Sequence, residues 1–350
     1  MNQKTKDFIT DYDQLYESMV KCRRGVMWKP STKSFVLNDI ENIFKMEKQL
    51  KTGVWKNGHP KPIKILYPKK RDGLSISFKD RIYQRSINDN ILYPATTKSF
   101  ILDNCACQKD KGPDYARTRL KKQLWNFYSH YGLDGYVMQT DILGYYPNMS
   151  HEEVKKSFAK YLEPEILQMV SDVLDTQYKG DIGYNPGSQM VQIAGITLLN
   201  ELDHFIKEQL HVHYYIRYMD DSIHLYHDIE DAKNNLRIIE QKLTEIGFRI
   251  NKKKTRIVPL TKGFMFLGFK YRITDTGKII MTLNPQNVKH ERRKLKKMVA
   301  KSKHGDISKD KVDECYNAWK NHAQHGNSYK LLERMDKYYK DLWEEKYDKI

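Results

Sequence analysis

Hydrophobic and polar positions follow two different periods along the chain, and each period predicts one kind of element. Apolar residues recur at helical spacing in several segments: 1–53, 79–93, 151–177, 189–210, 229–247 and the basic remainder from about Asn284. Other segments are extended or strand-like: 61–80, "LDGYVMQTD", "FRINKKKTRIVPL" and "GFMFLGFKYRIT". Strands interleaved with helices near the middle, and helices at both ends, predict an α+β core with helical flanks.

The segment "YIRYMDDSIHLYH", residues 215–227, is predicted to form a β-hairpin. Apolar and polar side chains alternate on both sides of two adjacent aspartates, which is typical of half-buried strands. Residues 219–222 would form the turn, with Asp220 and Asp221 projecting from its tip. Neighbouring carboxylates repel each other unless a cation lies near them, and Mg2+ prefers oxygen ligands. A solvated acidic turn is the alternative, because a Tyr-x-Asp-Asp string arises by chance in roughly one such sequence in seven.

Composition restricts the class of partner. The chain has 350 residues, of which 39% are hydrophobic, and this is enough for a substantial core in two or three subdomains. Its net charge of +17 favours a polyanion such as nucleic acid, with an anionic membrane surface as the competing partner. We find no apolar run of about 18 residues and no secretory leader, so we expect a cytoplasmic protein with no membrane partner. The four cysteines lack the paired spacing of zinc sites and are expected to be reduced structural thiols.

Asp141 supplies a third carboxylate. It ends the strand-like run in "VMQTDILGYYPN", and a turn follows it. A strand end can expose a functional side chain on rigid support. One carboxylate from this strand and one from the hairpin could clamp two Mg2+ ions about 3.5–4 Å apart, one activating a hydroxyl and the other neutralising a leaving phosphate. The pattern therefore predicts nucleotidyl transfer, with Asp141 and Asp220 as principal metal ligands and Asp221 as a secondary one.

These residues resemble those of reverse transcriptases, and the resemblance extends from about Arg23 to Trp343. Asp141 is similar to the first palm aspartate of that family, and "YMDD" at 218–221 is similar to its second aspartate motif. The resemblance implies an RNA-directed DNA polymerase that adds dNTPs to the 3′-hydroxyl of a DNA or RNA primer on an RNA template. It implies two Mg2+ ions, or Mn2+ in their place, with the Ile142 carbonyl as a further ligand. A cognate structured RNA is an expected partner, and the oligomeric state is not predicted.

The segment "YPKKRDGLSISFKDR" resembles the fingers motif of the family. The resemblance implies that Lys69 or Lys70, together with Arg71, grips the incoming triphosphate, since the planar guanidinium binds phosphate oxygens in pairs. Arg81 would support the fold or the template path. A solvated basic turn at 69–71 is the alternative when this motif is considered alone.

Further segments follow in the order of the family's motifs. "NPGSQMVQIAG" resembles the motif in which Gly187 lets the backbone approach the nascent base pair and Gln192 faces the template. "NKKKTRI" resembles the segment that carries a lysine near the departing pyrophosphate, here Lys254, for which a surface strand end is the alternative. "FMFLGF" resembles the primer grip, whose residues would be Phe266, Leu267 and Gly268. Five weak motifs in the polymerase order are much less probable by accident than any one of them.

Tyr146, the fifth residue after Asp141, is expected to select the sugar of the incoming nucleotide. Reverse transcriptases keep an aromatic ring beneath the ribose, where a 2′-hydroxyl would collide with it. Tyr145 is the alternative gate, although its register favours the palm core. An RNA-dependent RNA polymerase is the alternative enzyme, but such enzymes usually carry Gly-Asp-Asp at the hairpin and an acidic residue at the position of Tyr146.

We therefore expect a right-hand polymerase fold with an RRM-like antiparallel palm. The expected domains are an N-terminal helical extension (1–53), fingers (54–135), palm with intervening helices (136–274) and a helical thumb (275–350). The basic helix at 289–303 is a candidate contact for a phosphate backbone. Bacterial group II intron-like enzymes are the most similar, particularly those of diversity-generating retroelements and antiviral defence systems. A non-catalytic RNA-binding scaffold with a relic palm is the alternative from another class.

Overall fold

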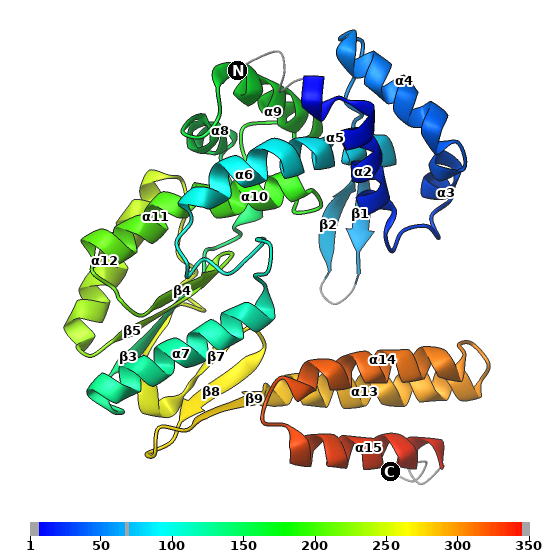
Figure 1. Ribbon diagram of the computed structural model, residues 1–350. Helices are drawn as coiled ribbons and strands as arrows, with labels where there is room; N and C mark the ends of the chain where they lie inside the picture. The colour runs from blue at the N-terminus through cyan, green and yellow to red at the C-terminus, as the bar shows by residue number, and fades with distance from the viewer. Residues whose placement is uncertain (1–6, 67–69, 345–350) are drawn as a thin grey trace. The chain divides into compact units, whose positions relative to one another are not determined.

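The computed structural model describes residues 7–66 and 70–344 (Figure 1). Its contacts divide the chain into two compact units. The first comprises Met1–Ala116, Gln139–Ser222 and Lys233–Thr255. The second comprises Arg117–Met138, Ile223–Ala232 and Arg256–Ile350. These units cut across the four domains expected from the sequence, so the domain boundaries stay a prediction.

The first unit begins with helices, as the sequence predicts for residues 1–53. They are α2 (Tyr12–Arg23), α3 (Pro30–Leu37) and α4 (Asp39–Lys51). The Asp11 side chain accepts a hydrogen bond from the Asp13 amide and so caps α2, while Pro30 opens α3 at a position where its missing N–H is not needed. Helix α2 packs along α5 (Phe78–Ile87), and both are seen side by side in Figure 1.

The extended stretch predicted for 61–80 is shorter in the structure. Strands β1 (Lys61–Ile65) and β2 (Arg71–Ser75) form an antiparallel hairpin, and α5 already begins at Phe78. The Ser77 hydroxyl accepts a hydrogen bond from the Asp80 amide at 3.2 Å, so a serine cap ends the extended segment. A π-helical turn (Asn88–Leu92) then leads into the short α6 (Tyr93–Thr96).

Helices also form the middle of the first unit. They are α8 (His151–Ala159), α9 (Pro164–Gln177), α10 (Gln189–Leu198), α11 (Asn200–His204) and α12 (Ile229–Glu245), the last of which begins in the second unit. The stretch predicted as one helical segment over 189–210 is interrupted at Leu199 and ends in a π-helical turn (Phe205–Gln209). Helix α10 is buried on nearly all sides, so it forms the centre of this unit.

A four-stranded sheet carries the aspartate hairpin, in the strand order β4 (Tyr215–Tyr218), β5 (Asp221–Tyr226), β3 (Tyr136–Thr140), β6 (Arg256–Pro259). The expectation of half-buried strands is wrong, because Tyr215, Ile216 and Arg217 are all buried and β5 is buried from Ser222 onward. The expected four-residue turn is also wrong: Met219 and Asp220 alone connect the strands. Both faces of these strands are covered, so a short buried run replaces simple alternation.

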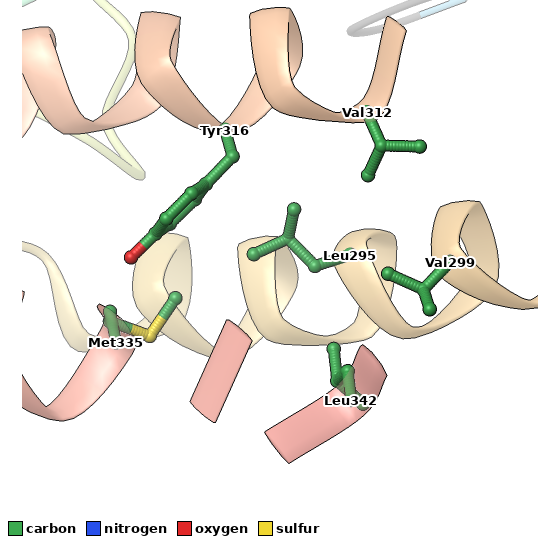
Figure 2. Close-up of a cluster of buried hydrophobic side chains, with 6 residues drawn as sticks. All are labelled: Leu295, Val299, Val312, Tyr316, Met335 and Leu342. Carbon is green, nitrogen blue, oxygen red and sulfur yellow. The ribbon is translucent and has the colours of Figure 1, made fainter. Parts of the chain in front are cut away.

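The second unit contains α7 from Arg117 onward (Pro113–Tyr131 as a whole), a second sheet and a helical bundle. The sheet is antiparallel, in the order β7 (Phe264–Phe266), β8 (Phe269–Ile273), β9 (Ile279–Leu283); the sequence pattern did not predict β9. The bundle consists of α13 (Pro285–Lys303), α14 (Lys309–Gln324) and α15 (Tyr329–Trp343). Its core is the cluster in Figure 2, formed by Leu295, Val299, Val312, Tyr316, Met335 and Leu342. The predicted helical remainder is thus confirmed for these three helices, but the expectation of helix from 275 is wrong, because β9 occupies 279–283. No helix in the described part of the chain is long and apolar enough to span a membrane.

Candidate active site

Asp141 lies directly after β3 and is nearly buried. Its Oδ1 accepts a hydrogen bond from Asn251 Nδ2 at 2.7 Å, and its Oδ2 lies 2.5 Å from Lys254 Nζ. The backbone N–H of Asn251 also donates a hydrogen bond to the backbone carbonyl of Asp141, at 2.8 Å. The turn at 251–254 therefore fixes this carboxylate from the backbone and the side chain together.

The hairpin turn holds Met219 in an unusual conformation. Its φ of +56° lies in the left-handed region, which glycine favours at the first central position of such turns. Two contacts keep it there: Arg217 Nη1 donates to the Met219 carbonyl at 2.9 Å, and Cys107 Sγ lies 3.5 Å from Met219 Sδ. The position of Asp220, the next residue, therefore depends on its neighbours and not on an intrinsic turn preference.

The three aspartates come together beside β3 and β5. Thr140 Oγ1 and Ser222 Oγ are 2.5 Å apart, and these residues flank Asp141 and Asp221 in the chain. Burial and the charge of Asp141 raise the pKa of Asp220, although Lys254 opposes the shift. Loss of hydration, the charge of Asp220 and the contact with Asp141 raise the pKa of Asp221, even though part of its side chain reaches solvent. The site therefore holds more negative charge than its own cations neutralise.

The donor set fits a hard divalent cation in its chemistry. Carboxylate oxygens are the ligands that Mg2+ prefers, and three carboxylates share one ammonium, that of Lys254, in this site. Within residues 7–66 and 70–344, however, no three His, Cys, Asp or Glu side chains are already arranged to hold an ion. The Lys254 ammonium takes the place beside Asp141 that a cation would need.

Ile142 forms an isolated β-bridge with Ile250. The two hydrogen bonds of this bridge use the Asp141 carbonyl and the Leu143 amide. Neither uses the Ile142 carbonyl, so the bridge does not occupy the group that the sequence resemblance assigns to a metal. Its role as a ligand stays a prediction.

Tyr145 and Tyr146 have different environments. Tyr145 is buried, packs against Phe248 and donates its hydroxyl hydrogen bond to the Gly195 carbonyl. Tyr146 is half-buried, and its ring meets that of Tyr145 edge-on with centroids 5.4 Å apart. Burial, Cys107 and Asp220 all raise the pKa of Tyr146, so this ring lies near the hairpin aspartate. A side chain at Gly195 would come within 3.5 Å of both rings, so the glycine leaves room for them.

Gly187 and Gln192 lie at the start of α10. A side chain at Gly187 would meet the Leu74 carbonyl of β2 at 3.3 Å, so the close approach visible here is to the β1–β2 hairpin. Gln192 Nε2 donates to the Pro186 carbonyl at 3.3 Å, and its Oε1 lies 3.9 Å from Cys107 Sγ. Cys107 also contacts Met219 in the hairpin turn, so Gln192 lies close to that turn.

The fingers residues are only partly described. Lys69 lies outside the described residues, and Lys70 is exposed just before β2. Arg71 begins β2 opposite Ile65, and its side chain is not among those described. Arg81 lies half-buried on α5. Their assignment to the triphosphate and the template stays a prediction.

The residues expected to form the primer grip lie at the end of β7 and in its turn to β8, in the second unit. Phe266 is buried, and Leu267 and Gly268 form a two-residue turn with φ of +46° and +84°. Such a turn needs positive φ at both central residues, and this explains the glycine. The contact with a primer stays a prediction.

Sequence reasoning missed the ion pair that supports the hairpin. Arg217 is 2% exposed and forms a bidentate pair with Asp203 of α11, with Nε–Oδ1 and Nη2–Oδ2 distances of 2.7 and 2.5 Å. The Tyr215 hydroxyl donates to the same carboxylate at 2.6 Å. An arginine within an otherwise apolar strand was the available signal, because buried charges are nearly always paired.

Comparisons with known proteins give one family match and several structural similarities. A family model described as "Reverse transcriptase (RNA-dependent DNA polymerase)" matches residues 76–271, which is more than half of the chain. A telomerase from Candida albicans, solved with a TWJ fragment of telomeric RNA, is similar with a TM-score of 0.48 and 13% identity over 69% of this chain and 49% of that one. A truncated apo telomerase from Candida tropicalis is similar with a TM-score of 0.48 and 14% identity, over 64% of this chain and 55% of that one. The chain thus spans about half the length of these telomerases.

No curated protein matches the chain. The family match, together with the mixed sheets and helices, confirms the predicted α+β fold class of right-hand polymerases. The chain belongs to the reverse transcriptase family.

Proposed function

We propose that this protein is an RNA-directed DNA polymerase, which adds deoxynucleotides to the 3′-hydroxyl of a primer paired with an RNA template. One observation carries the proposal: Asp141, Asp220 and Asp221 meet at one place, with Lys254 against them. Acidic groups that raise one another's pKa values in this way mark a site built to bind positive charge. The match of residues 76–271 to the reverse transcriptase family supports the reaction.

The residues of this chain would act mainly by position and charge. Asp141 and Asp220 would hold the cations and Asp221 would orient them. Divalent ions, two Mg2+ or Mn2+ in their place, would activate the primer hydroxyl and neutralise the leaving phosphate. Lys254 would then be released from Asp141 and would face the phosphate that departs.

Lys254→Gln should increase the affinity of the free protein for divalent cations. The ammonium competes with them at Asp141, and its side chain is 64% exposed, so its loss should be worth about 1 kcal/mol, or roughly fivefold in Kd. Titration calorimetry with MnCl2, without nucleic acid, measures this. Lys253→Gln removes the same charge from the neighbouring exposed residue and is the control. Equal affinities in the parent and the Lys254 variant would show that the lysine does not compete.

Tyr146→Ala should raise the use of ribonucleotides relative to deoxynucleotides. A ring beneath the sugar discriminates by overlap, and overpacking costs of about 1–3 kcal/mol correspond to roughly 5- to 150-fold in selectivity. The assay is single-nucleotide extension of a primed RNA template with each sugar in turn. Tyr146→Phe keeps the ring and should keep the parent ratio.

The same assay tests the proposed function. A parent enzyme that prefers ribonucleotides would replace it with RNA-directed RNA synthesis. An unchanged ratio in Tyr146→Ala would remove this residue from the gate.

Helix α13 is a candidate contact for the template–primer backbone. Its buried face packs in the helical bundle, and Arg293, Lys296 and Lys297 are exposed. Changing these three residues to Gln should weaken duplex binding regardless of sequence and lower the slope of log K against log salt by up to about 3. Arg292 is left unchanged because its guanidinium packs over the Tyr338 ring.

A matched variant tests whether position on α13 matters. Lys330, Arg334 and Lys337 are exposed on α15, and their change to Gln removes the same charge from another helix. If both triple variants lower the slope equally, α13 has no specific role.

We further propose that the enzyme is of the bacterial group II-like type, acts in the cytoplasm and serves a retroelement or an antiviral defence system with a cognate structured RNA. The motifs quoted above and the net charge of +17 support this assignment. Sequencing of the RNA and DNA that copurify with the protein tests it, since a defined template RNA separates these roles.

A further inference from the structure

Helix α7 carries a row of aromatic side chains on its surface in the second unit. Trp125, Tyr128 and Tyr131 follow one another at three-residue steps, so their side chains lie along one ridge of the helix and rise by about 4.5 Å per step. Trp125 is 52% exposed and Tyr131 is 43% exposed, and the Tyr131 ring stacks on that of His227 with centroids 4.8 Å apart. Because large aromatic rings are mostly buried in proteins, an exposed row of them indicates a contact surface.

The turn between β8 and β9 holds this aromatic row rigidly. Gly277 in the turn has a φ of +77°, and a side chain there would overlap Tyr128 Cε1 and come within 3.1 Å of Trp125 Cζ3. The Tyr128 hydroxyl donates to the Asp275 carbonyl at 2.6 Å, and the Trp125 ring stacks against that of Tyr128 with centroids 6.1 Å apart. Rings that are already fixed lose little further freedom when a ligand binds to them.

The surroundings of the aromatic row are basic. Residues 117–131 of α7 include two arginines, two lysines and no acidic residue. Lys121 and Lys122 lie one helical turn before the row, and Lys278 lies in the β8–β9 turn. None of these three lysines forms an ion pair within the part of the chain that the structure describes. The exposed carboxylate of Asp275 cannot neutralise all three, so the surface keeps an excess of positive charge.

Aromatic rings between cations suit single-stranded nucleic acid. Bases stack on such rings with little regard to sequence, and lysines contact the phosphates. An anionic lipid surface also attracts cations, but it requires apolar side chains that insert among the acyl chains. The exposed residues of α7 from 117 onward include no aliphatic side chain, so nucleic acid is the favoured partner.

The aromatic row lies at the opposite end of the β7–β9 sheet from the expected primer grip. Strand β8 runs from the turn at 267–268, where the primer contact is expected, to the turn at 274–278, which packs against the row. Its five residues separate the two turns by about 17 Å. A strand bound to the row is therefore distinct from the primer end.

We propose that the aromatic row is a second RNA-binding site, which holds an unpaired segment of the cognate RNA outside the template–primer duplex. Bases stack on Trp125 and Tyr131, and the phosphates lie against Lys121, Lys122 and Lys278. The inference rests on the proposed function and extends it, because it gives the cognate RNA a surface of its own on the enzyme.

Binding of a single-stranded RNA to the full chain tests the proposal. A fluorescein-labelled uridine 12-mer is added to protein already saturated with an unlabelled primer–template duplex, and anisotropy gives its affinity. The 12-mer should bind this complex, and Trp125→Ala should weaken the binding at least about fivefold, because a stacked base is lost. Trp125→Phe keeps a ring and should keep most of the affinity. Tyr329→Ala removes a ring that is 75% exposed at the start of α15 and is the control.

Two further measurements separate stacking from a general loss of structure. The 12-mer should quench the tryptophan fluorescence of the parent protein, and most of this quenching should be absent in Trp125→Phe. Lys122→Gln/Lys278→Gln should lower the slope of log K against log salt by about 1.4, which is about 0.7 for each lost phosphate contact of a single strand. Lys330→Gln/Lys337→Gln removes the same charge from exposed positions on α15 and should leave the slope unchanged.

Three results would overturn the proposal. They are no binding of the 12-mer to the duplex-saturated protein, equal binding by Trp125→Ala, or binding to phosphatidylserine vesicles that depends on Trp125 in place of RNA binding. Primer extension on the same duplex is measured in parallel, and Trp125→Ala should extend the primer at the parent rate. Failure of extension by the parent protein counts against the polymerase function itself, whereas failure of 12-mer binding alone counts against the second site.

Discussion

Asp220→Asn should abolish primer extension on an RNA template, with a loss of at least about a thousandfold, while the protein stays folded. Asparagine keeps the shape of the side chain and removes the charge that a cation needs. Burial and the charge of Asp141 raise the pKa of Asp220 in the folded protein, so ionised Asp220 lowers the stability of the fold at neutral pH. The variant should therefore unfold at the same temperature as the parent protein or at a slightly higher one.

The two measurements together make this prediction specific. Steady-state extension with Mg2+ reports the loss of activity, and thermal unfolding reports the gain or retention of stability. Asp172→Asn removes one charge from an exposed position on α9 and should change neither. Extension by the Asp220 variant at close to the parent rate would show that this carboxylate does not hold the cation.

The sequence predicted most of the helices because their apolar spacing is local information. It failed where a neighbouring element decides the structure. The hairpin strands are buried on both faces because other elements cover them, whereas the start of α5 at Phe78, with its local cap Ser77, lies within one residue of the expected start. Met219 adopts a left-handed conformation that its residue type disfavours, and only its contacts with Cys107 and Arg217 account for it.

For the active site, the order of the motifs along the chain was informative. The hydrogen-bond and ion-pair partners of the single residues could not be predicted. The motifs placed Asp141, Asp220 and Asp221 in one site, and the structure does bring them together. The resemblance singled out Lys254 in "NKKKTRI", but its pairing with Asp141 could not be read from the sequence, because the two residues are far apart in the chain. Asn251 was not predicted, because its role depends on a hydrogen bond to Asp141, which lies 110 residues earlier in the chain.

Asp203→Asn should destabilise the first unit by about 3–5 kcal/mol. The change leaves the Arg217 guanidinium buried without its counter-charge, and it weakens the acceptor of the Tyr215 hydroxyl. Urea unfolding followed by circular dichroism measures the loss. Asp175→Asn, at an exposed position on α9 of the same unit, is the control and should cost less than about 1 kcal/mol.

A double variant separates the two roles of Arg217. Asp203→Leu/Arg217→Met removes both buried charges together, so most of the lost stability should return, because an apolar pair of similar size is often neutral or stabilising. Activity should not return with the stability. The variant lacks the hydrogen bond from the Arg217 guanidinium to the Met219 carbonyl, so the strained turn that positions Asp220 is released. A stable double variant with full primer extension would mean that the ion pair serves the fold alone. A stable but slow enzyme would show that the pair was retained to hold the catalytic turn.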